Sequence, residues 1–342
     1  IREEGRMSAA EATTTVPRAS AARLPLIIAS FLAATLFVLG LDQFINALTL
    51  GAIYALIALG YTMVYGIIEL INFAHGDVYM ASTFVAMFTI QTLLGRSGAI
   101  ESIPELAVAL VIVFVITASF MGLAGVVIER FAYRPLRRAP RLAPLITAIG
   151  VSFIIQNIIQ FAFGPTIVSV PQIIPISWSF MVGESRVPIL NLFVVAVALI
   201  LMAVLQLFIA RTRTGRAMRT TAMDRDASAL MGVDINKTIM LTFLIGSALA
   251  GAAGVVHVLY YGNTQFGLGF QSGLKAFTAA VLGGIGNTAG AALGGFLIAF
   301  VEVGASAFGY GRWGGGIVFT LLVIFLVFRP TGLLGSSTGD RA

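Results

Sequence analysis

The stretch from Leu48 to Met80 reads LTLGAIYALIALGYTMVYGIIELINFAHGDVYM, and it decides the class of the fold. Its first part belongs to an uncharged run, Gln43 to Ile68, which is longer than the about 20 apolar residues that a helix needs to cross a lipid bilayer. Glu69 ends this run, and a polar cluster between Asn72 and Asp77 precedes the next apolar stretch. The sequence therefore predicts membrane-crossing helices with a polar break between two of them.

The composition of the whole chain agrees with a lipid environment. Of 342 residues, 58% are hydrophobic and 11% are charged, and the mean hydropathy is +0.97. Soluble domains carry about 25% charged residues, so a water-soluble protein with one ordinary core is excluded. The high apolar content excludes a disordered chain, and the absence of cysteine excludes a disulfide scaffold.

Nine apolar stretches are long enough to be considered as membrane spans. They are Leu24–Leu41, Gln43–Ile68, Val78–Gly95, Leu106–Ile128, Leu142–Phe163, Val187–Ala210, Thr238–Tyr260, Ala276–Val301 and Gly314–Phe328. The eighth is interrupted by glycines, and we expect these to break it into two passages: Gly283, Gly284, Gly286 and Gly290. Because lipid offers no partners to backbone polar groups, we expect an all-α polytopic bundle of about 8–10 transmembrane elements, with ten favoured.

The basic residues give the orientation of these spans. Five arginines lie between Arg130 and Arg141, five more lie between Arg211 and Arg225, and four precede the first span. By the positive-inside rule, the N-terminus and both arginine loops of this multi-pass membrane protein are expected to be cytoplasmic. The net charge of +6 is then an orientation signal, and no nucleic acid is expected as a partner.

This orientation divides the chain into three parts. We expect a flexible cytoplasmic tail over residues 1–23, a transmembrane domain over 24–335 and a cytoplasmic tail over 336–342. Only one basic residue lies in the loop from Gly164 to Arg186, which is therefore expected on the outer side.

The chain carries no recognisable energy source. A phosphate-cradling loop needs a lysine after Gly-x-x-x-x-Gly, and neither Lys237 nor Lys275 has that context. The two histidines, His75 and His257, are a weak basis for a haem or metal site. We expect no catalytic residue, no cofactor and no metal, so active transport would draw its energy from another chain.

The second arginine loop contains a short helix with recognisable ends. Asp224 is suited to cap its start, and Gly232 is suited to stop it. Ala227, Leu230 and Met231 share one side at i, i+3, i+4 spacing and form a small apolar knob. The knob could dock into a groove of a soluble partner, or the helix could rest on the membrane surface.

Several long motifs, in order, resemble the LivH-type permeases of bacterial branched-chain amino-acid ABC importers. They cover most of the chain from Leu41 to Gly335 and comprise Leu48–Met80, Glu129–Leu136, Leu145–Gly150, Lys275–Gly286 and Arg329–Gly335. The resemblance implies the ABC importer permease fold, alternating access and a location in the bacterial plasma (inner) membrane. It also implies as partners a second, homologous permease, two cytoplasmic ATP-binding subunits and an extracytoplasmic solute-binding protein. The segment from Asp224 to Gly232 matches the ATPase-coupling segment of this family.

Asn72, His75, Gly76 and Asp77 form the densest polar cluster beside a span. Ionisable groups in hydrocarbon are costly and usually face a bundle interior or a cavity. One hypothesis is a helix break that lines the translocation path or its gate. The other is a tight connection between spans, in which Asn72 caps a helix and His75 bonds a neighbouring carbonyl.

Two further sets are candidates for the path. Tyr54, Tyr61 and Tyr65 fall within about 40° of arc on one helix face, which suits either a packing seam or a path lining. Gln156 and Asn157 lie in an uncharged span, where their amides need partners, in a neighbouring helix or in the path.

The sequence thus predicts a permease subunit, without enzymatic activity of its own, that carries hydrophobic, branched-chain amino acids inward. Alternatives are the same architecture importing urea, short amides or another small solute, a stand-alone channel or secondary carrier, and a membrane scaffold.

Overall fold

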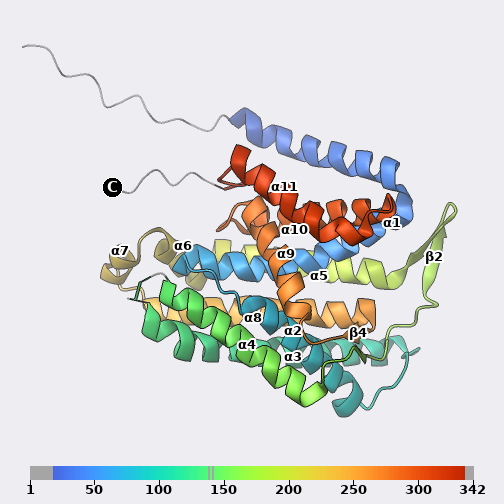
Figure 1. Cartoon of the computed structure of the whole chain (residues 1–342), viewed down its shortest axis with the longest axis horizontal. Helices are drawn as coiled ribbons and strands as arrows, with labels where there is room; N and C mark the ends of the chain where they lie inside the picture. Colours follow the sequence, from blue (N-terminus) through green and yellow to red (C-terminus); the bar gives the residue numbers. More distant parts are fainter. Residues whose placement is uncertain (1–17, 138, 141, 336–342) are drawn as a thin grey trace, which may run out of the picture.

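The computed structural model describes residues 18–137, 139–140 and 142–335, and helices dominate it (Figure 1). The α-helices are α1 Arg18–Ile68, α2 His75–Phe88, α3 Ile103–Ile128, α4 Leu142–Phe163, α5 Ile189–Arg211, α6 Arg213–Met223, α7 Arg225–Leu230, α8 Ile235–Tyr261, α9 Leu268–Gly283, α10 Thr288–Ala307 and α11 Gly314–Phe328. The π-helical turns η1 Thr89–Leu93 and η2 Glu129–Tyr133 extend α2 and α3, and η3 Arg134–Leu136 and η4 Gly311–Trp313 are 3-10 turns. The predicted all-α class is confirmed.

Seven helical segments among the described residues are long and apolar enough to cross a membrane. The first of them, Ile28–Ile68, contains Gly40 with φ +75° and ψ 167°, a conformation outside the helical region. Figure 1 shows α1 doubling back at this point. Phe31 and Phe44, on opposite sides of the break, both pack on Phe300 of α10, with ring centroids 5.6 and 5.4 Å away. The two spans predicted before and after Leu41 are therefore separate passages.

The glycine-rich stretch between α9 and α10 is also broken as predicted. Gly284 and Gly286 have φ values of +105° and +91°, which side chains rarely adopt. Asn287 then caps α10 by accepting a hydrogen bond from the backbone N–H of Gly290 at 3.0 Å. Gly290 itself does not break the chain, because it lies in the first turn of α10. Counting both halves of α1 and the shorter α2–η1 and α9, the described residues supply ten apolar helical elements.

The segment after α11 forms hydrogen bonds to the residues around this break. Leu333 and Leu334 donate backbone hydrogen bonds to Leu282 and Gly283, at 2.9 and 3.0 Å. The side chain of Asn287 donates to the carbonyl oxygen of Leu334 at 2.9 Å. Two of the motifs that carried the family resemblance, Lys275–Gly286 and Arg329–Gly335, therefore meet in space and hold one another.

The core lies around α8 and the second half of α1. Nearly all of α8 from Gly246 to Leu259 is buried, whereas α4, α5 and α11 keep broad apolar faces exposed. Phe161 of α4, for example, is 94% exposed. An exposed apolar surface of this extent fits a protein whose outer helices face lipid.

The two ends of the bundle differ in structure. The arginine loops and α7 lie at one end, and the strands lie at the other (Figure 1). There β1 Val168–Ser169 pairs antiparallel with β4 Asn263–Thr264, while β2 Ser179–Val182 and β3 Ser185–Pro188 form a hairpin. The loop from Gly164 to Arg186, predicted to lie on the outer side, is thus folded and sits opposite α7.

The first arginine loop also forms ion pairs and hydrogen bonds within the bundle. Glu129 is fully buried and forms ion pairs with Arg134, at 2.8 Å, and with Arg137. Arg137 also donates to the side-chain oxygen of Asn236, at 2.6 Å, beside the start of α8. Arg138 and Arg141 of this loop lie outside the described residues, as do residues 1–17 and 336–342 of the two predicted tails.

Candidate functional site: a closed path along α1

One face of the second half of α1 connects two hollow regions of the protein. Tyr54 lines a pocket near β4, and Tyr65 lines a larger cavity at the α7 end. At a rise of 1.5 Å per residue, these two tyrosines are about 16 Å apart along the helix. Tyr61 lies between them on the same face and is only 5% exposed. The three tyrosines predicted to share a face therefore follow one line through the molecule.

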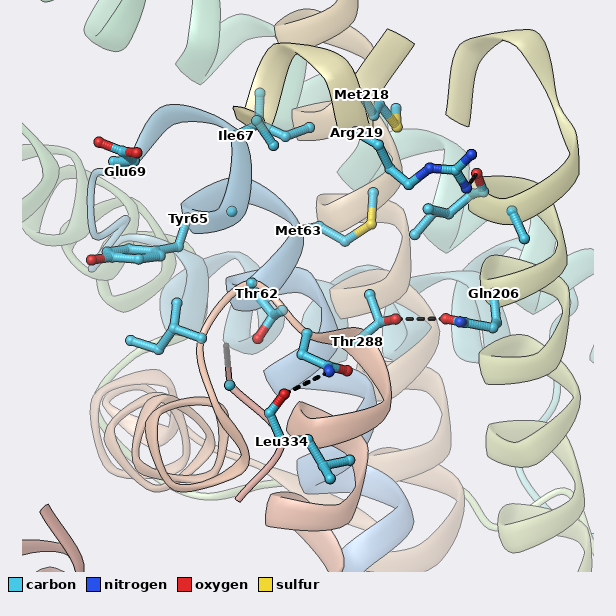
Figure 2. A pocket seen from close by; sticks show the side chains of 18 residues that line it. Thr62, Met63, Tyr65, Ile67, Glu69, Gln206, Met218, Arg219, Thr288 and Leu334 are labelled. Carbon is cyan, nitrogen blue, oxygen red and sulfur yellow. Dashed lines mark hydrogen bonds between the residues drawn. The ribbon is translucent and has the colours of Figure 1, made fainter. Parts of the chain in front are cut away.

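The cavity at the α7 end, here the α6 cavity, lies between the end of α1, α5, α6 and the α9–α10 connection, and has a volume of about 640 Å³. In Figure 2, Met63 points toward its middle, and Thr288 and Gln206 face each other across one wall. The Thr288 hydroxyl donates to the Gln206 side-chain oxygen at 2.6 Å. Arg219 donates to the backbone oxygen of Ile209 at 2.7 Å. Polar groups thus border a space at the end of the bundle that carries the basic loops.

The space between the two hollow regions is nearly filled by side chains. Tyr61, Tyr65 and Asn72 line a cavity of only about 10 Å³, which is at the lower limit for a single water molecule. The Tyr61 ring packs edge-on against His75, with centroids 4.7 Å apart, and against Phe277 at 6.0 Å. Three of the residues predicted for a path or gate, Tyr61, Asn72 and His75, therefore lie close together between the two hollow regions.

The start of α2 differs from the tight-connection hypothesis. Ala74 is the N-cap residue, and no side chain caps this helix. Asn72 instead accepts a hydrogen bond at 3.0 Å from the hydroxyl of Tyr133, at the end of α3. The ring of the buried His75 lies near the backbone of Ile57 on α1. The capping role considered for Asn72 is wrong, because its side chain takes part in a contact with a distant segment, and the carbonyl bond considered for His75 stays a prediction.

Asp77 links α2 to the peripheral helix α4. Its carboxylate accepts hydrogen bonds from the Ser152 hydroxyl, at 2.5 Å, and from the Gln156 amide, at 3.0 Å. Asp77 is 1% exposed, and Ser152 is 8% exposed. Asn157 does not join this group, since it is exposed and donates at 2.7 Å to the backbone oxygen of Phe153 on its own helix. The structure therefore brings Gln156 to the cluster and leaves Asn157 on the outer face of α4.

Glycines let the helices at this cluster approach one another. A methyl group on Gly76 would lie 2.4 Å from the backbone oxygen of Gly269, and one on Gly269 would lie 2.6 Å from the Asp77 carboxylate. A methyl group on Gly60 of α1 would lie 2.2 Å from Nε2 of His75. Only glycine fits at these positions without displacement of the neighbouring helix. Gly76 is thus placed at the crossing of α2 and α9.

The predicted short helix between the two spans is present as α7, with the predicted ends. The Asp224 side chain accepts from the backbone N–H of Ala227 at 2.9 Å. Gly232 has φ +84°, and Val233 bonds back to the carbonyl of Ser228 at 3.0 Å, as in a Schellman cap. Leu230 and Met231 are 89% and 85% exposed. Ala227 is also exposed, so the apolar knob projects from the end of the molecule.

The α7 segment contacts the end of α1. Arg225 donates at 3.0 Å to the backbone oxygen of Ile67, in the last turn of α1. A second cavity, of about 540 Å³, lies between Glu69, Arg137 and the start of α7. The end of α1 therefore separates this cavity from the α6 cavity, and Arg225 joins α7 to the same turn that carries Tyr65.

Lys275 and Glu302 belong to the pocket near β4 and were not among the predicted site residues. The Lys275 ammonium lies 2.5 Å from Oε1 of Glu302, and the Tyr54 hydroxyl donates to Oε2 at 2.9 Å. The sequence did contain a signal for Lys275 and Glu302, because an ionisable residue within an apolar run is usually paired with another polar group. Their pairing was hidden because they lie on different helices, and each could equally extend to the membrane surface.

Comparison with known proteins places this architecture in a family. The model of the family described as branched-chain amino acid transport system, permease component, matches residues 43–327. The high-affinity branched-chain amino acid transport system permease protein BraD of Pseudomonas aeruginosa is 45% identical over 301 residues, which are 86% of this chain and 95% of BraD. The corresponding LivH proteins of Salmonella typhimurium and Escherichia coli are 41% and 40% identical over 304 residues, 87% of this chain and 96% of theirs.

No solved structure shows a significant match to the chain. The extent of the family match and of the identity to BraD and LivH is nevertheless decisive, since both run through nearly all of the described bundle. The chain is a multi-pass membrane protein and belongs to the family of permease components of branched-chain amino acid transport systems.

Proposed function

We propose that this chain is one of two homologous permease subunits of an ATP-driven importer for branched-chain amino acids. The observation that carries the proposal is the 40–45% identity to permeases of high-affinity branched-chain amino acid transport systems over most of the chain. The hollow regions at the two ends of the tyrosine face, with a closed centre, suit alternating access, in which the solute is never exposed to both sides at once.

The partners follow from this assignment. Two cytoplasmic ATP-binding subunits supply the energy, the second permease completes the pore, and an extracytoplasmic binding protein delivers the solute. The basic loops and α7 then face the cytoplasm, as does the N-terminus, and the β2–β3 hairpin faces the binding protein. The membrane is the bacterial plasma membrane.

Coupling to the ATP-binding subunits is assigned to α7. Ala227, Leu230 and Met231 offer an exposed apolar knob of the kind that docks into a protein groove. Asp224 and Gly232 fix the two ends of this helix and so hold the knob in shape. Movement of α7 would reach the path through Arg225 and the carbonyl of Ile67, 3.0 Å apart.

The gate is assigned to the closed centre and the start of α2. Tyr61 and Asn72 form the constriction, and Tyr65 borders the α6 cavity beyond it. His75 is buried against the Tyr61 ring, so a second arrangement of α1 and α2 would change the surroundings of both side chains. Gly76, Asp77 and Gln156 hold α2 against α9 and α4. Asn157 faces outward, toward lipid or the second permease.

The assignment is tested with the whole assembly in proteoliposomes. The chain, its partner permease and the two ATP-binding subunits are reconstituted, and uptake of radiolabelled leucine is measured with ATP and the binding protein. ATP-dependent uptake is expected. Uptake of urea or a short amide in place of leucine would contradict the proposed cargo, and flux without ATP would indicate a channel or secondary carrier.

The coupling role is tested by placing a charge on the knob. Leu230→Asp is expected to reduce co-purification of the ATP-binding subunits and leucine uptake by about tenfold, with normal abundance in the membrane, because a buried unpaired carboxylate weakens a docking contact. Ala229→Asp is the matched control, since position 229 is exposed but points about 100° away from Leu230. If Leu230→Asp keeps both co-purification of the ATP-binding subunits and leucine uptake at the wild-type level, the coupling assignment is wrong.

A further inference from the structure

The pocket near β4 has charged and aromatic walls inside the membrane bundle. It has a volume of about 230 Å³ and lies between α1, α8, α9 and α10, with Asn263 of β4 at its edge. Lys275 and Glu302 are each 20% exposed, so a small solute can reach both charges. The Lys275 ammonium also lies 5.8 Å from the centroid of the Tyr54 ring. We call this the Tyr54 pocket.

A second polar pair also lines the Tyr54 pocket. The Tyr79 hydroxyl lies 2.7 Å from Nδ1 of His257, and the His257 ring stacks near that of Tyr261, with centroids 4.6 Å apart. Leu50, Ile53 and Leu268 supply apolar surface to the same pocket. The pocket therefore combines one positive charge, one negative charge and an apolar side.

We propose that the Tyr54 pocket is the subsite that holds the zwitterionic main-chain groups of the transported amino acid. The solute carboxylate binds the Lys275 ammonium, and the solute ammonium binds Glu302 and the face of Tyr54. The aliphatic side chain packs on Leu50, Ile53 and Leu268. This inference rests on the proposed function and names the site at which its cargo is held.

Charge balance selects a zwitterion over other small solutes. In the empty pocket Lys275 and Glu302 neutralise each other, so the pair leaves no net charge at this place. A zwitterion offers each of them an opposite charge in exchange, and the sum of charges stays zero. A solute with a single charge would leave either Lys275 or Glu302 without a partner, and urea would separate the pair without replacing either charge. Both outcomes are costly within a membrane.

The size and place of the Tyr54 pocket agree with this role. Its volume is below the about 300–1,000 Å³ of pockets for drug-sized ligands, which suits one small amino acid. It lies on the tyrosine face of α1 before the closed centre at Tyr61, at the end of the path away from α7. A solute held there would meet Tyr61 and His75 next on its way along α1.

The test is equilibrium binding of tritiated leucine to the purified complex of both permeases and the ATP-binding subunits, without the solute-binding protein. Lys275→Met and Glu302→Gln are each expected to weaken leucine binding about tenfold or more, because each removes one charge-assisted contact. Leucinol, which lacks the carboxylate, and 4-methylvaleric acid, which lacks the ammonium, are expected to compete with leucine at least about tenfold less well.

The double variant K275M/E302Q separates binding from a purely structural ion pair. If the pair only holds α9 to α10, removal of both charges restores stability that the single variants lose, and leucine binding returns to the wild-type value. If the pair binds the solute, the double variant is purified as an intact complex and still binds leucine poorly. Restored binding in the double variant, or equal competition by leucinol, overturns the proposal.

An exposed ion pair is the matched control. Arg96 and Glu105 pair outside the Tyr54 pocket and are 40% and 46% exposed, so R96M, E105Q and their combination are expected to bind leucine normally. Wild-type complex that imports leucine while the Lys275 and Glu302 variants bind it normally rejects this subsite and leaves the proposed function intact. Wild-type complex that neither binds nor imports leucine rejects both.

Discussion

The Asp77 cluster and the Tyr54 pocket place a carboxylate in the same bundle by different means. Asp77 accepts hydrogen bonds from an uncharged hydroxyl and an uncharged amide and is 1% exposed. Glu302 is held by an ammonium and a tyrosine hydroxyl and remains 20% exposed. Uncharged donors that are buried with a carboxylate hold it in one position, because no solute can contact it. An ion pair that a solute can contact is able to exchange its partners with a zwitterion. The difference separates a contact that holds helices together from one that can bind a solute.

Glu129 extends this comparison to the rim of the bundle and gives the largest expected effect. Glu129→Ala would leave Arg134 and Arg137 without their common partner, and Arg137 is 16% exposed. We expect a loss of about 3 kcal/mol in the free energy of unfolding, because breaking a buried pair leaves uncompensated charge. The measurement is denaturant unfolding of the purified complex.

The control for Glu129 is Glu105→Ala, which removes the acid from an exposed ion pair. Its expected cost is below about 1 kcal/mol. If the two variants unfold at the same denaturant concentration, burial of Glu129 does not matter to stability, and the comparison between locked and reachable carboxylates loses its physical basis.

Asp77→Ala tests the locked carboxylate itself. The change would leave the Ser152 hydroxyl and the Gln156 amide without their acceptor, at a cost of about 1–3 kcal/mol in the free energy of unfolding. Asp77→Asn keeps one acceptor oxygen and should cost less. The order Ala worse than Asn worse than wild type, measured by the same unfolding experiment, is the expected result.

The opposite order, in which Asn is more stable than wild type, would mean that the negative charge of Asp77 destabilises the folded protein. The role of Asp77 would then lie in movement of α2 and not in its contact with α4. Limited proteolysis of the loop before α4 provides an independent reading, since loss of this contact should detach α4 first.

Local chemistry predicted much of the fold and of the α7 segment. The apolar runs placed the spans, the glycines after α9 placed a break, and Asp224 and Gly232 placed the ends of α7, because each of these acts through its own neighbours in the chain. Local patterns did not predict contacts between segments that are distant in the sequence. Asn72 looked like a helix cap, yet Tyr133, at the end of another helix, takes its side chain. Lys275 and Glu302 are joined only once α9 folds against α10.

The smallest effects are expected for two neighbouring amides on α4. One of them bonds to the buried carboxylate of Asp77, and the other is exposed. Gln156 donates to Asp77 at 3.0 Å, whereas Asn157, one residue later and about 100° around the helix, bonds only to its own helix and is exposed. Gln156→Ala should therefore cost about 1 kcal/mol and Asn157→Ala less than about 0.5 kcal/mol in the free energy of unfolding. In an Asp77→Ala background the Gln156→Ala cost should shrink, since its acceptor is already gone, while the Asn157→Ala cost should not change. If Gln156→Ala costs the same in both backgrounds, Gln156 acts independently of Asp77, and Ser152 is then the side chain of α4 that stabilises the Asp77 carboxylate.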